Sequence, residues 1–353
     1  MKKSNILMII IIALVVSVCG YTIYRHFNYE IPDEIIPYSH YMDIIEDDNG
    51  YVVVGVNNYY KEDSKYNKDI ILQGDFIKFD KNLNIVKKVK YDDDNNGFMS
   101  REIIKVDDGY IVTGMIMPLN RVKSVVLKLD KDLNVVKKIY LNELDSTVAM
   151  RTVKDNNKYI VLTRTYRKNG EAISEEYNVI FEIDNDLNII HRIPYKEGYM
   201  LDQLFLQGDN YLLIGNNESE SVVVTLSKDT KEIISTKSIN IPNKEDVYLY
   251  NNKLYTNKIV YDLSTDEFVN FSGESLVDNH ILLIEDDIIY VSRTEENKES
   301  IYTYDLDMNK IKEYKDKIDD IDKLINYEDK FLIIGCETSD DDSIKPIIKF
   351  IEK

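Results

Sequence analysis

The stretch Asp108-Gly109-Tyr110-Ile111-Val112-Thr113-Gly114 decides the fold, because related stretches return along the whole chain. Each has an acidic or Asn turn, an aromatic or aliphatic residue and a short apolar strand. The copies begin at Asp48, Asp108, Asn157 and Asp209, weaken at Leu254 and Ile288, and end with a strong strand at Phe331. Tyr51 and Phe331 are 280 positions apart over six steps, so the repeat is about 47 residues long. This period is typical of four-stranded propeller blades.

A second motif follows the first in most copies, as in Leu127-Lys128-Leu129-Asp130-Lys131-Asp132-Leu133-Asn134. Its other copies are Ile77–Asn84, Phe181–Asn188 and Tyr302–Asn309, with a degenerate one at Val224–Lys231. The alternation of apolar and polar residues indicates a strand, and we assign the turn to the hairpin between the third and fourth strands. Asp and Asn tolerate the left-handed conformation that Gly otherwise supplies, which explains how an all-β chain manages with 13 Gly. Recurring aspartates such as Asp130 are therefore expected to be structural.

The repeat predicts an all-β fold, a β-propeller of about seven four-stranded blades, with six as the alternative. The alternative arises because the fifth copy, Asp246 to Ser272, is short. The seventh copy, Asp322 to Lys353, has room for three strands only, and we expect residues 33–39 to supply its fourth strand. A strand from the other end of the chain would close the ring and remove a free sheet edge. One propeller domain then covers residues 29–353, and no Pro- or Gly-rich linker supports a second domain.

In these two motifs the chain resembles bacterial extracytoplasmic β-propeller repeat proteins, whose blades carry an Asp-Gly-Gly-Tyr turn and a later turn containing Gly-Asn. The resemblance covers roughly residues 40 to 353. Two features depart from the class: Leu83, Leu133 and Leu187 stand where a turn Gly is usual, and the chain has no Trp, although a fourth-strand Trp is common. The missing Trp also argues against a likeness to quinone-dependent propeller dehydrogenases. The resemblance implies the fold and little about function, because propellers host many activities.

The first 28 residues are predicted to anchor the chain in a membrane. Residues 6–24 carry no formal charge over 19 positions, and a helix of that length spans about 28 Å, close to the hydrocarbon thickness of a bilayer. Lys2 and Lys3 favour a cytoplasmic start, so we expect a single-pass signal anchor at the cell membrane with the propeller outside the cytoplasm. Two alternatives also place the propeller outside: lipidation of Cys19 at a lipoprotein-like cleavage box, or cleavage after Gly20 and secretion.

Composition and motifs exclude several classes of function. With 44 Lys and Arg against 63 Asp and Glu, the net charge is −19, which argues against nucleic acid as a partner. Two cysteines cannot form a disulfide framework, and the four histidines show neither metal-ligand spacing nor a catalytic motif. Comparison between copies favours a packed thiol for Cys336 and a solvated strand face for His191. We therefore assign no catalytic residue and no cofactor apart from calcium.

Asp92, Asp94 and Asn96, which precede a turn glycine, form the candidate calcium site. Oxygen ligands at alternate positions suit Ca²⁺, which takes about six to eight oxygens. The EF-hand pattern, however, needs Glu at its twelfth position, and that position is Ile103, one residue after Glu102. On a strand this slip would point the carboxylate to the opposite face. The alternative is a solvated acidic loop.

Propeller geometry predicts where a partner would bind. Turns between the first and second strands, and between the third and fourth, are short and crowd one face, so the longer connections belong to the opposite face. The candidates for contact with a partner on these connections are Tyr59, Tyr60, Tyr66, Arg121 and Arg167. The tyrosines could stack on a sugar or hydrogen-bond a peptide, and ordinary exposed tyrosines are the alternative in a chain that has 27 of them.

Together these features favour a membrane-anchored, extracytoplasmic binding or assembly module without catalytic activity. Its partners would be the membrane, through the N-terminal helix, and a cell-surface protein, peptide or glycan. The alternative is a propeller hydrolase or lyase with acidic residues, with or without calcium, at the propeller centre. A transmembrane signalling receptor is disfavoured, because only about five residues would lie on the cytoplasmic side.

Overall fold

The computed structural model describes most of the chain from residue 39 onward. The described residues are 39–60, 70–94, 96–118, 121–169, 172–217, 220–239, 247–257, 259–269, 279–295, 298–327, 329–338 and 344–353. None of them belongs to a helix with the length and hydropathy that crossing a bilayer requires. The predicted anchor at residues 6–24, with Cys19, lies outside the described residues, as does Tyr66.

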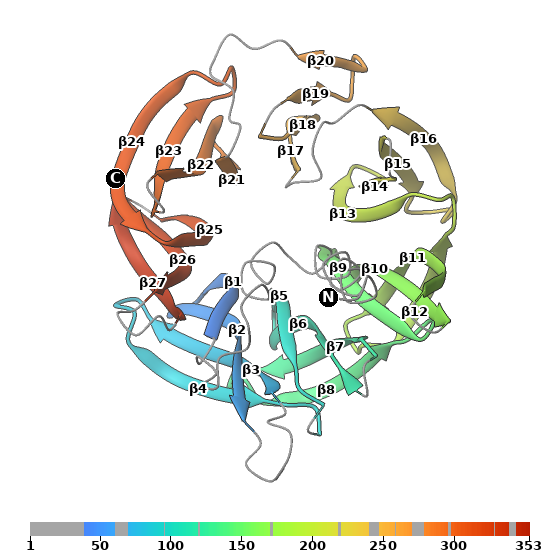
Figure 1. Cartoon of the computed structure of the whole chain (residues 1–353), viewed down its shortest axis with the longest axis horizontal. Helices are drawn as coiled ribbons and strands as arrows, with labels where there is room; N and C mark the ends of the chain where they lie inside the picture. The colour runs from blue at the N-terminus through green and yellow to red at the C-terminus, as the bar shows by residue number, and fades with distance from the viewer. Residues whose placement is uncertain are drawn as a thin grey trace, which may run out of the picture. The chain divides into compact units, whose positions relative to one another are not determined.

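The described strands form seven antiparallel sheets that follow one another in chain order around a central axis (Figure 1). Six sheets contain four strands and the last contains three. This arrangement confirms the predicted all-β propeller. It also decides for seven blades over six, because the short fifth copy still forms a sheet, made of four three-residue strands. The blades are numbered 1 to 7 in chain order.

Each blade begins near the axis and proceeds outward (Figure 1). The innermost strands are β1 (Ser39–Asp47), β5 (Met99–Val106), β9 (Ser146–Asp155), β13 (Met200–Gln207), β17 (Tyr248–Tyr250), β21 (Asn279–Glu285) and β25 (Asp320–Tyr327). The second strands are β2 (Gly50–Tyr60), β6 (Gly109–Ile116), β10 (Lys158–Asn169), β14 (Asn210–Asn216), β18 (Lys253–Tyr255), β22 (Ile288–Glu295) and β26 (Lys330–Thr338). The third strands are β3 (Ile70–Asp80), β7 (Lys123–Asp130), β11 (Ala172–Asp184), β15 (Ser221–Ser227), β19 (Val260–Asp262), β23 (Lys298–Asp305) and β27 (Ile344–Glu352). The outermost strands are β4 (Ile85–Tyr91), β8 (Val135–Leu141), β12 (Ile189–Tyr195), β16 (Ile233–Ile239), β20 (Glu267–Val269) and β24 (Lys310–Ile318).

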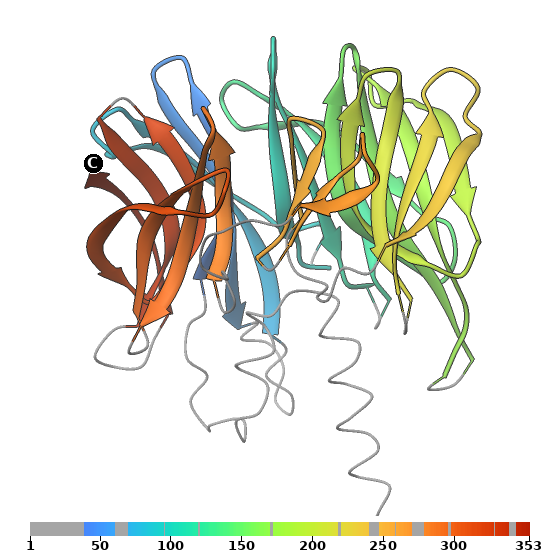
Figure 2. The same cartoon turned by 90° about the horizontal axis from the view of Figure 1, so that it is seen from above.

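The two sequence motifs occupy fixed places in the blade. The first motif forms the hairpin between the innermost and second strands, and the second motif forms the third strand and its hairpin to the outermost strand. Gly109 opens β6 with a φ of 152°, and a Cβ atom there would lie 2.0 Å from the Leu129 carbonyl oxygen, so this position requires glycine. Both kinds of short hairpin lie on one face of the disc, here called the short-hairpin face (Figure 2). The other connections leave from the opposite, long-connection face.

The aspartate at the end of the third strand folds the hairpin that follows it. Asp130 Oδ1 accepts hydrogen bonds from the backbone N–H groups of Asp132 (2.9 Å) and Asn134 (2.8 Å), and Asn134 Nδ2 donates to Asp130 Oδ2 (2.9 Å). The same three bonds form in the hairpins of Asp80, Asp184 and Asp305. These recurring aspartates are therefore structural, as predicted.

The left-handed residue of these hairpins differs from the one predicted. Leu133 has a φ of 63°, and Leu83, Leu187 and Met308 adopt similar values at the same place. The prediction that Asp and Asn supply this conformation is therefore wrong here, although it holds in the innermost-to-second-strand hairpin at Asn156, with a φ of 55°. An apolar residue occupies the strained position of the blade 2 hairpin because its side chain fills the core between blades: Leu133 is 0% exposed.

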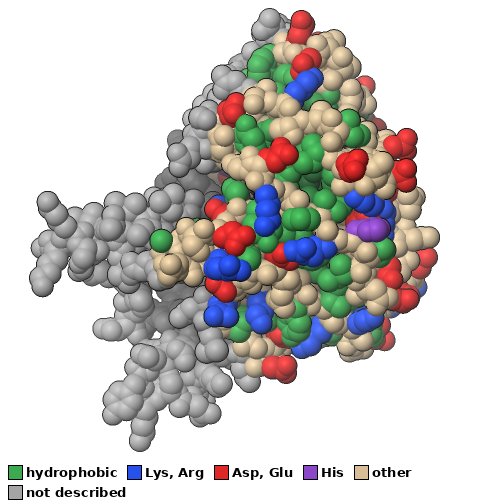
Figure 3. Space-filling view, turned by 90° about the vertical axis from the view of Figure 1, so that its right-hand side faces the viewer, with side chains coloured by type: hydrophobic (Ala, Val, Ile, Leu, Met, Phe, Trp, Pro, Cys, Tyr) green, Lys and Arg blue, Asp and Glu red, His purple; other side chains and the backbone are tan. Residues whose placement is uncertain are grey.

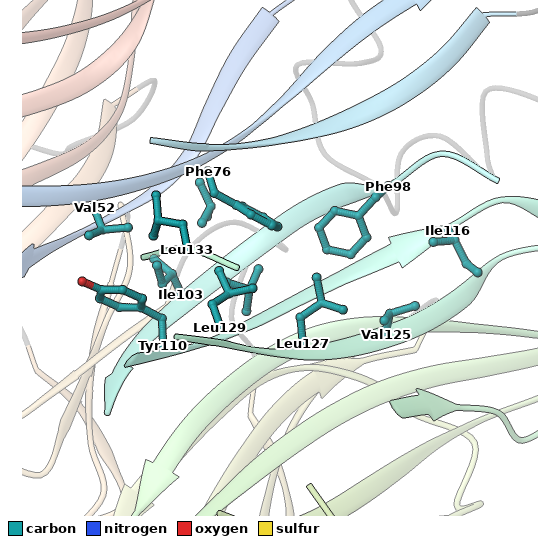
Figure 4. Close-up of a cluster of buried hydrophobic side chains, with 12 residues drawn as sticks. Val52, Phe76, Phe98, Ile103, Tyr110, Ile116, Val125, Leu127, Leu129 and Leu133 are labelled. Carbon is teal, nitrogen blue, oxygen red and sulfur yellow. The ribbon is translucent and has the colours of Figure 1, made fainter. Parts of the chain in front are cut away.

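The hydrophobic core lies between neighbouring blades. Val52 and Phe76 of blade 1 pack against Phe98, Tyr110 and Leu133 of blade 2 (Figure 4). Comparable clusters fill the seams between blades 2 and 3, 4 and 5, 5 and 6, 6 and 7, and 7 and 1. Each blade is thus stabilised mainly through its neighbours, because burying apolar surface contributes about 25 cal/mol per Å².

Blade 7 closes the ring by packing its side chains on blade 1. Leu332 and Ile334 of blade 7 share a cluster with Ile44 and Val53 of blade 1. Among the described residues, β1 pairs with β2 alone. Residues 33–38 of the strand predicted to complete blade 7 lie outside the described residues, and Ser39, its last residue, is instead the first residue of β1.

The outermost strands present a free sheet edge. Register shifts in five of them mark a β-bulge whose extra residue is an exposed Val or Ile: Val86, Val136, Ile190, Ile234 and Ile311. Bulges and charged residues at an edge hinder pairing with another chain. In blade 1 the lysine after the bulge also reaches the next blade, since Lys87 Nζ lies 3.7 Å from Asp132 Oδ1. On the side of β12 and β16, apolar side chains lie at the surface among Lys and Arg (Figure 3).

Replacing Leu133 with Gly is expected to lower the free energy of unfolding by roughly 1–3 kcal/mol. Glycine removes a left-handed strain of about 1–2 kcal/mol, but loss of a buried leucine side chain costs about 2–5 kcal/mol. Chemical denaturation of the full-length chain measures the difference. Leu83→Gly is the matched control, because it relieves the same strain at a side chain that is only half-buried. Equal stability of the two variants would contradict the packing explanation.

Candidate functional site

Every innermost strand except β17 carries a β-bulge at the same level. The extra residues are Met42, Arg101, Met150, Asp202, Leu282 and Asp322. A bulge disrupts the ladder with the second strand and leaves backbone groups available to the neighbouring blade. Because the bulge marks the same level in six blades, the residues around the axis can be compared position by position.

Carboxylates just after the bulge join neighbouring blades. Asp43 Oδ2 accepts a hydrogen bond from Ile103 N–H of blade 2 (2.9 Å), and Glu102 Oε2 accepts one from Thr152 N–H of blade 3 (2.5 Å). Asp43 also bonds Lys323 of blade 7, so this carboxylate connects three consecutive blades. Charge-assisted bonds of this kind are strong, and they engage both acidic residues in holding the ring.

Residues two places before the bulge set one sector of the ring apart. In blades 2, 3 and 4 this position is apolar, with Met99, Val148 and Met200. In blades 1, 6 and 7 it is ionisable, with His40, His280 and Asp320. We define the blade-seven cluster as the interacting ionisable residues His40, His280, Glu299, Asp320, Asp322 and Cys336. Because its chemistry is confined to one sector, it is a stronger functional candidate than any recurring position.

His40 forms a dyad with Asp322 across the seam between blades 1 and 7. The imidazole is 3% exposed, and its Nε2 atom lies 2.8 Å from Asp322 Oδ1. Burial lowers the pKa of His40, but the hydrogen bond and charge of Asp322, helped by the charge of Asp320, outweigh burial and raise the net pKa above its ordinary value. A buried imidazole bonded to a carboxylate can hold or release a proton near neutral pH.

Glu299 lies in the seam between blades 6 and 7. Its side chain is 5% exposed, and its Oε2 atom accepts a hydrogen bond from Ile321 N–H (2.8 Å). Burial raises the pKa of Glu299 to about 7, and the charge of Asp320 adds to this, while Ile321 N–H, His280 and Ser292 oppose it. Glu299 is therefore a second group that exchanges its proton near neutral pH.

Cys336 is a packed thiol, as the sequence predicted. Burial raises its pKa to about 12, and the charges of Asp320 and Asp322 act in the same direction. The thiolate is the reactive form of cysteine, so Cys336 is inert as a nucleophile at neutral pH. In the described parts of the chain, no three or more His, Cys, Asp or Glu side chains are placed to hold a metal ion.

None of the blade-seven cluster was predicted as a site, although the sequence carries a signal for it. Glu299 stands six residues before the aspartate that ends its third strand, where other blades have Gly74, Ser124 and Asn178. An ionisable residue among small and neutral ones was therefore visible in the aligned copies. The bulges in β1 and β25 that bring His40 and Asp322 side by side have no comparable signature in the sequence.

The three candidate calcium ligands lie on the connection from β4 to β5, which also contains the buried and extensively hydrogen-bonded Asp93. Asp93 is 2% exposed, and its carboxylate accepts hydrogen bonds from the Tyr91 and Tyr140 hydroxyls (both 2.7 Å) and from Lys138 Nζ (2.6 Å). Burial raises the pKa of Asp93, but these three bonds outweigh burial and lower it. Asp93 therefore joins blade 1 to the outermost strand of blade 2.

The candidate ligands themselves surround this buried group. Asp94 is exposed, with its Oδ2 atom 3.7 Å from Lys138 Nζ, and Asn96 Nδ2 donates to the Asp93 carbonyl oxygen (2.8 Å). Asp92 is half-buried. Lys138 lies beside the carboxylates of Asp93 and Asp94 and would compete with a cation for them. Calcium at Asp92, Asp94 and Asn96 stays a prediction.

The predicted partner-contact residues that the structure describes lie at the long-connection ends of three consecutive blades. Tyr59 and Tyr60 end β2, where they pair with β3. Arg121 is exposed between β6 and β7, and its N–H donates to the Pro118 carbonyl oxygen (2.9 Å). Arg167 in β10 pairs with Glu175 of β11 at 3.4 Å. Arg121 and Arg167 therefore differ, because among the described residues Arg167 has an ionic partner and Arg121 has none.

His191 is exposed on β12, which confirms the predicted solvated strand face. Its Nε2 atom lies 3.9 Å from Glu182 Oε2, a buried carboxylate that also bonds Lys231 and the Tyr211 hydroxyl (2.8 Å). Glu182 thus belongs to a structural link between blades 3 and 4, and His191 borders it from solvent.

A hollow of about 460 Å³ lies on the short-hairpin face between blades 1 and 2. Lys105 lies in it and pairs with Asp48 (2.6 Å) and Asp47 (3.4 Å). Burial raises the pKa of Asp47, but bonds from Lys78 and Tyr110 outweigh burial and hold it at about 2. Paired charges of this kind join two blades and leave the hollow without an organised set of groups for a ligand.

Comparison with known proteins supports the fold. No family model matches the chain, and no curated protein matches it. Many solved structures do. A puromycin-hydrolysing peptidase of Mycobacterium tuberculosis superposes with a TM-score of 0.57 at 10% identity, over 90% of this chain and 53% of the peptidase. This chain thus spans about half the length of that enzyme.

Two isolated propellers are also similar. The propeller domain of the trilobed protease from Pyrococcus furiosus, described as having an open velcro topology, gives a TM-score of 0.53 at 11% identity, covering 90% of this chain and 96% of that domain. The Pan2 WD40 domain of Neurospora crassa gives 0.52 at 12% identity, covering 84% and 86%. Identities this low establish the seven-bladed fold alone, and membership of the bacterial extracytoplasmic repeat class stays a prediction.

Replacing Asp322 with Asn is expected to lower the pKa of His40. The variant removes the charge that favours the imidazolium form, whereas the burial that disfavours this form remains. Proton NMR of the imidazole resonances, titrated in the wild-type and variant chains, measures the change. An unaltered His40 pKa in Asp322→Asn would show that the dyad does not control this proton.

Proposed function

We propose that this chain is a membrane-anchored, extracytoplasmic β-propeller that acts as a non-catalytic binding or assembly module for a protein, peptide or glycan. The observation that supports this proposal most strongly is that ionisable groups around the axis bond neighbouring blades to one another. Asp43 and Glu102 bond backbone N–H groups of the next blade, and Lys323 bonds Asp43. These groups make the disc a rigid scaffold for the connections on its long-connection face.

The long-connection face is the proposed binding surface. It has longer and less regular connections than the short-hairpin face, whose turns are held by recurring Asp-Asn hydrogen bonds. Arg121 is exposed there, and Tyr59 and Tyr60 of β2 and Arg167 of β10 lie at strand ends on the same face. Tyr66 is predicted to belong to the connection that follows β2. Arg and Tyr are enriched at the centres of protein interfaces and also suit glycan contacts.

The proposed location rests on the uncharged run of residues 6–24 behind two lysines. An extracytoplasmic disc on a single anchor would present its surface to components of the cell envelope. The acidic net charge of −19 disfavours nucleic acid as the partner.

Arg121→Glu is expected to reduce recovery of the partner several-fold in cross-linking on intact cells that express the full-length chain. The reason is that charge reversal at an interface introduces repulsion without disturbing the blade core. Lys131→Glu, an exposed reversal on the short-hairpin face, is the matched control and is expected to leave recovery unchanged. Equal effects of both variants, or loss with Lys131→Glu alone, would contradict the assignment of the binding face.

The alternative function is a hydrolase or lyase with an acidic centre, with or without calcium. The observation that favours it is the blade-seven cluster, which places the His40–Asp322 dyad and Glu299 in one sector of the ring. Such pairs of groups with shifted pKa values are typical of acid–base sites and also occur in structural networks. The inert thiol of Cys336 argues against a cysteine nucleophile there.

If Asp92, Asp94 and Asn96 bind calcium, millimolar Ca²⁺ is expected to raise the melting temperature of the full-length chain by several degrees relative to EDTA. Binding to the folded state alone stabilises it by mass action. Asp94→Asn should remove the shift, whereas Asp132→Asn, at an exposed turn aspartate, should not. The absence of any shift, or the same shift in Asp94→Asn, would exclude this site.

A further inference from the structure

Asn178 in blade 3 and Glu299 in blade 6 occupy equivalent positions. Each stands six residues before the aspartate that ends its third strand. Each contacts the residue just before the bulge in the innermost strand of the next blade, which is Leu201 in blade 4 and Ile321 in blade 7. The two seams are therefore the same structural unit with a different side chain.

In the seam between blades 3 and 4, a neutral amide serves as both acceptor and donor. Asn178 Oδ1 accepts a hydrogen bond from Leu201 N–H (2.7 Å). Asn178 Nδ2 donates to the carbonyl oxygens of Leu201 (2.7 Å) and Thr163 (3.0 Å). The seam therefore requires a side chain with both functions, and the amide is neutral at every physiological pH.

In the seam between blades 6 and 7, the carboxyl of Glu299 offers both a donor and an acceptor, as the amide of Asn178 does, only when it is protonated. An ionised carboxylate accepts hydrogen bonds and donates none, whereas a neutral carboxylic acid offers one donor and further acceptor capacity, like the amide. Glu299 Oε2 accepts from Ile321 N–H (2.8 Å), and Thr294 Oγ1 lies 3.4 Å from Glu299 Oε1. The ionised form would be a buried charge in the place of a neutral group.

The groups around Glu299 compensate such a charge only in part, through Ile321 N–H, His280 and Ser292. Asp320 and the thiol of Cys336 face it from blade 7, and His280 and Ser292 face it from blade 6. The adjacent Lys298 is paired with Asp319 and is thus engaged elsewhere. Ionisation would therefore place two carboxylates, those of Glu299 and Asp320, together across the seam.

The other seam of blade 7 has the same preference. His40 of blade 1 bonds Asp322 and is influenced by Asp320, so its protonated form completes an ion pair with blade 7. Nearby, Lys323 of blade 7 pairs with Asp43 of blade 1. Protonation of either titrating group, His40 or Glu299, strengthens the hold on β25.

We propose that blade 7 is held in the ring by a proton-dependent seam, in which protonated Glu299 and protonated His40 keep β25 against blades 6 and 1. As pH rises, these protonated forms are lost and blade 7 loosens. This device is independent of the proposed binding function, because it concerns how the ring closes and not which surface binds a partner.

The direction of the pH dependence follows from proton binding in the closed and open states. An exposed Glu in an open seam titrates at about 4.3, whereas burial raises the pKa of Glu299 to about 7 in the closed seam. The closed seam therefore binds more protons, and opening becomes up to about ten-fold more favourable per pH unit between pH 5 and pH 7. Above that range the effect of Glu299 levels off, and the loss of the His40 proton adds to it as pH passes above 6.5.

Hydrogen exchange of the full-length chain, measured by mass spectrometry from pH 5 to pH 8 and corrected for intrinsic rates, tests the proposal. Peptides from β25, which contain Ile321 N–H, are expected to lose about 10- to 100-fold of protection between pH 5 and pH 7. Peptides from β13, which contain Leu201 N–H, report the neutral seam and are expected to change far less. Identical pH profiles for β25 and β13 would overturn the proposal.

Two substitutions exchange the side-chain types of the two seams, placing an amide at residue 299 and a carboxyl at residue 178. Glu299→Gln keeps a neutral donor and acceptor, so protection of β25 should stay constant from pH 5 to pH 6.5. Asn178→Asp should transfer a pH-dependent loss of protection to β13. A wild-type profile of β25 in Glu299→Gln, or an unchanged β13 in Asn178→Asp, would contradict the role of the carboxyl. If Glu299→Gln does not fold, Asn178→Asp and the wild-type comparison decide.

Discussion

A four-stranded blade has two apolar faces and cannot bury either of them by itself, so each blade must be covered on both sides by its neighbours. This constraint explains why the core consists of seams, such as the one in which Phe76 of blade 1 meets Phe98 and Leu133 of blade 2. It also explains the hairpin leucines. Left-handed strain at Leu133 is tolerated because the side chain that causes it covers the adjoining blade. Blade 7 must meet blade 1 for the same reason.

The polar groups near the axis are shaped by the same seams. The bulges turn backbone N–H groups toward the neighbouring blade, and Asp43 meets one of them with the help of Lys323. Glu299 also meets a backbone N–H, but Asp320 faces it where Asp43 has a lysine. Two carboxyls that each accept a hydrogen bond from a backbone N–H thus have neighbours of opposite charge, and these neighbours rather than the hydrogen bond set them apart.

The period of the repeat, the blade count and the turn aspartates could be predicted because each depends on local sequence that recurs. The residue that adopts the left-handed conformation could not, since the choice of Leu133 over Asp132 depends on packing across a seam. The blade-seven cluster was missed for a related reason. His40 and Asp322 are 282 positions apart and meet only after the ring closes, at levels that depend on bulges. Calcium at Asp94 and the contacts of Arg121 depend on partners that sequence patterns do not specify.

The bulged outermost strands have a consequence for how the protein is made. Blade 1 leaves the ribosome early, but its second neighbour, blade 7, is synthesised last among the blades. For most of translation the growing arc therefore exposes an apolar face at each end, together with the sheet edges of its finished blades. Bulges at Val86, Val136, Ile190 and Ile234 make those edges poor templates for another chain. The rim thus protects unfinished molecules from one another until the ring is complete.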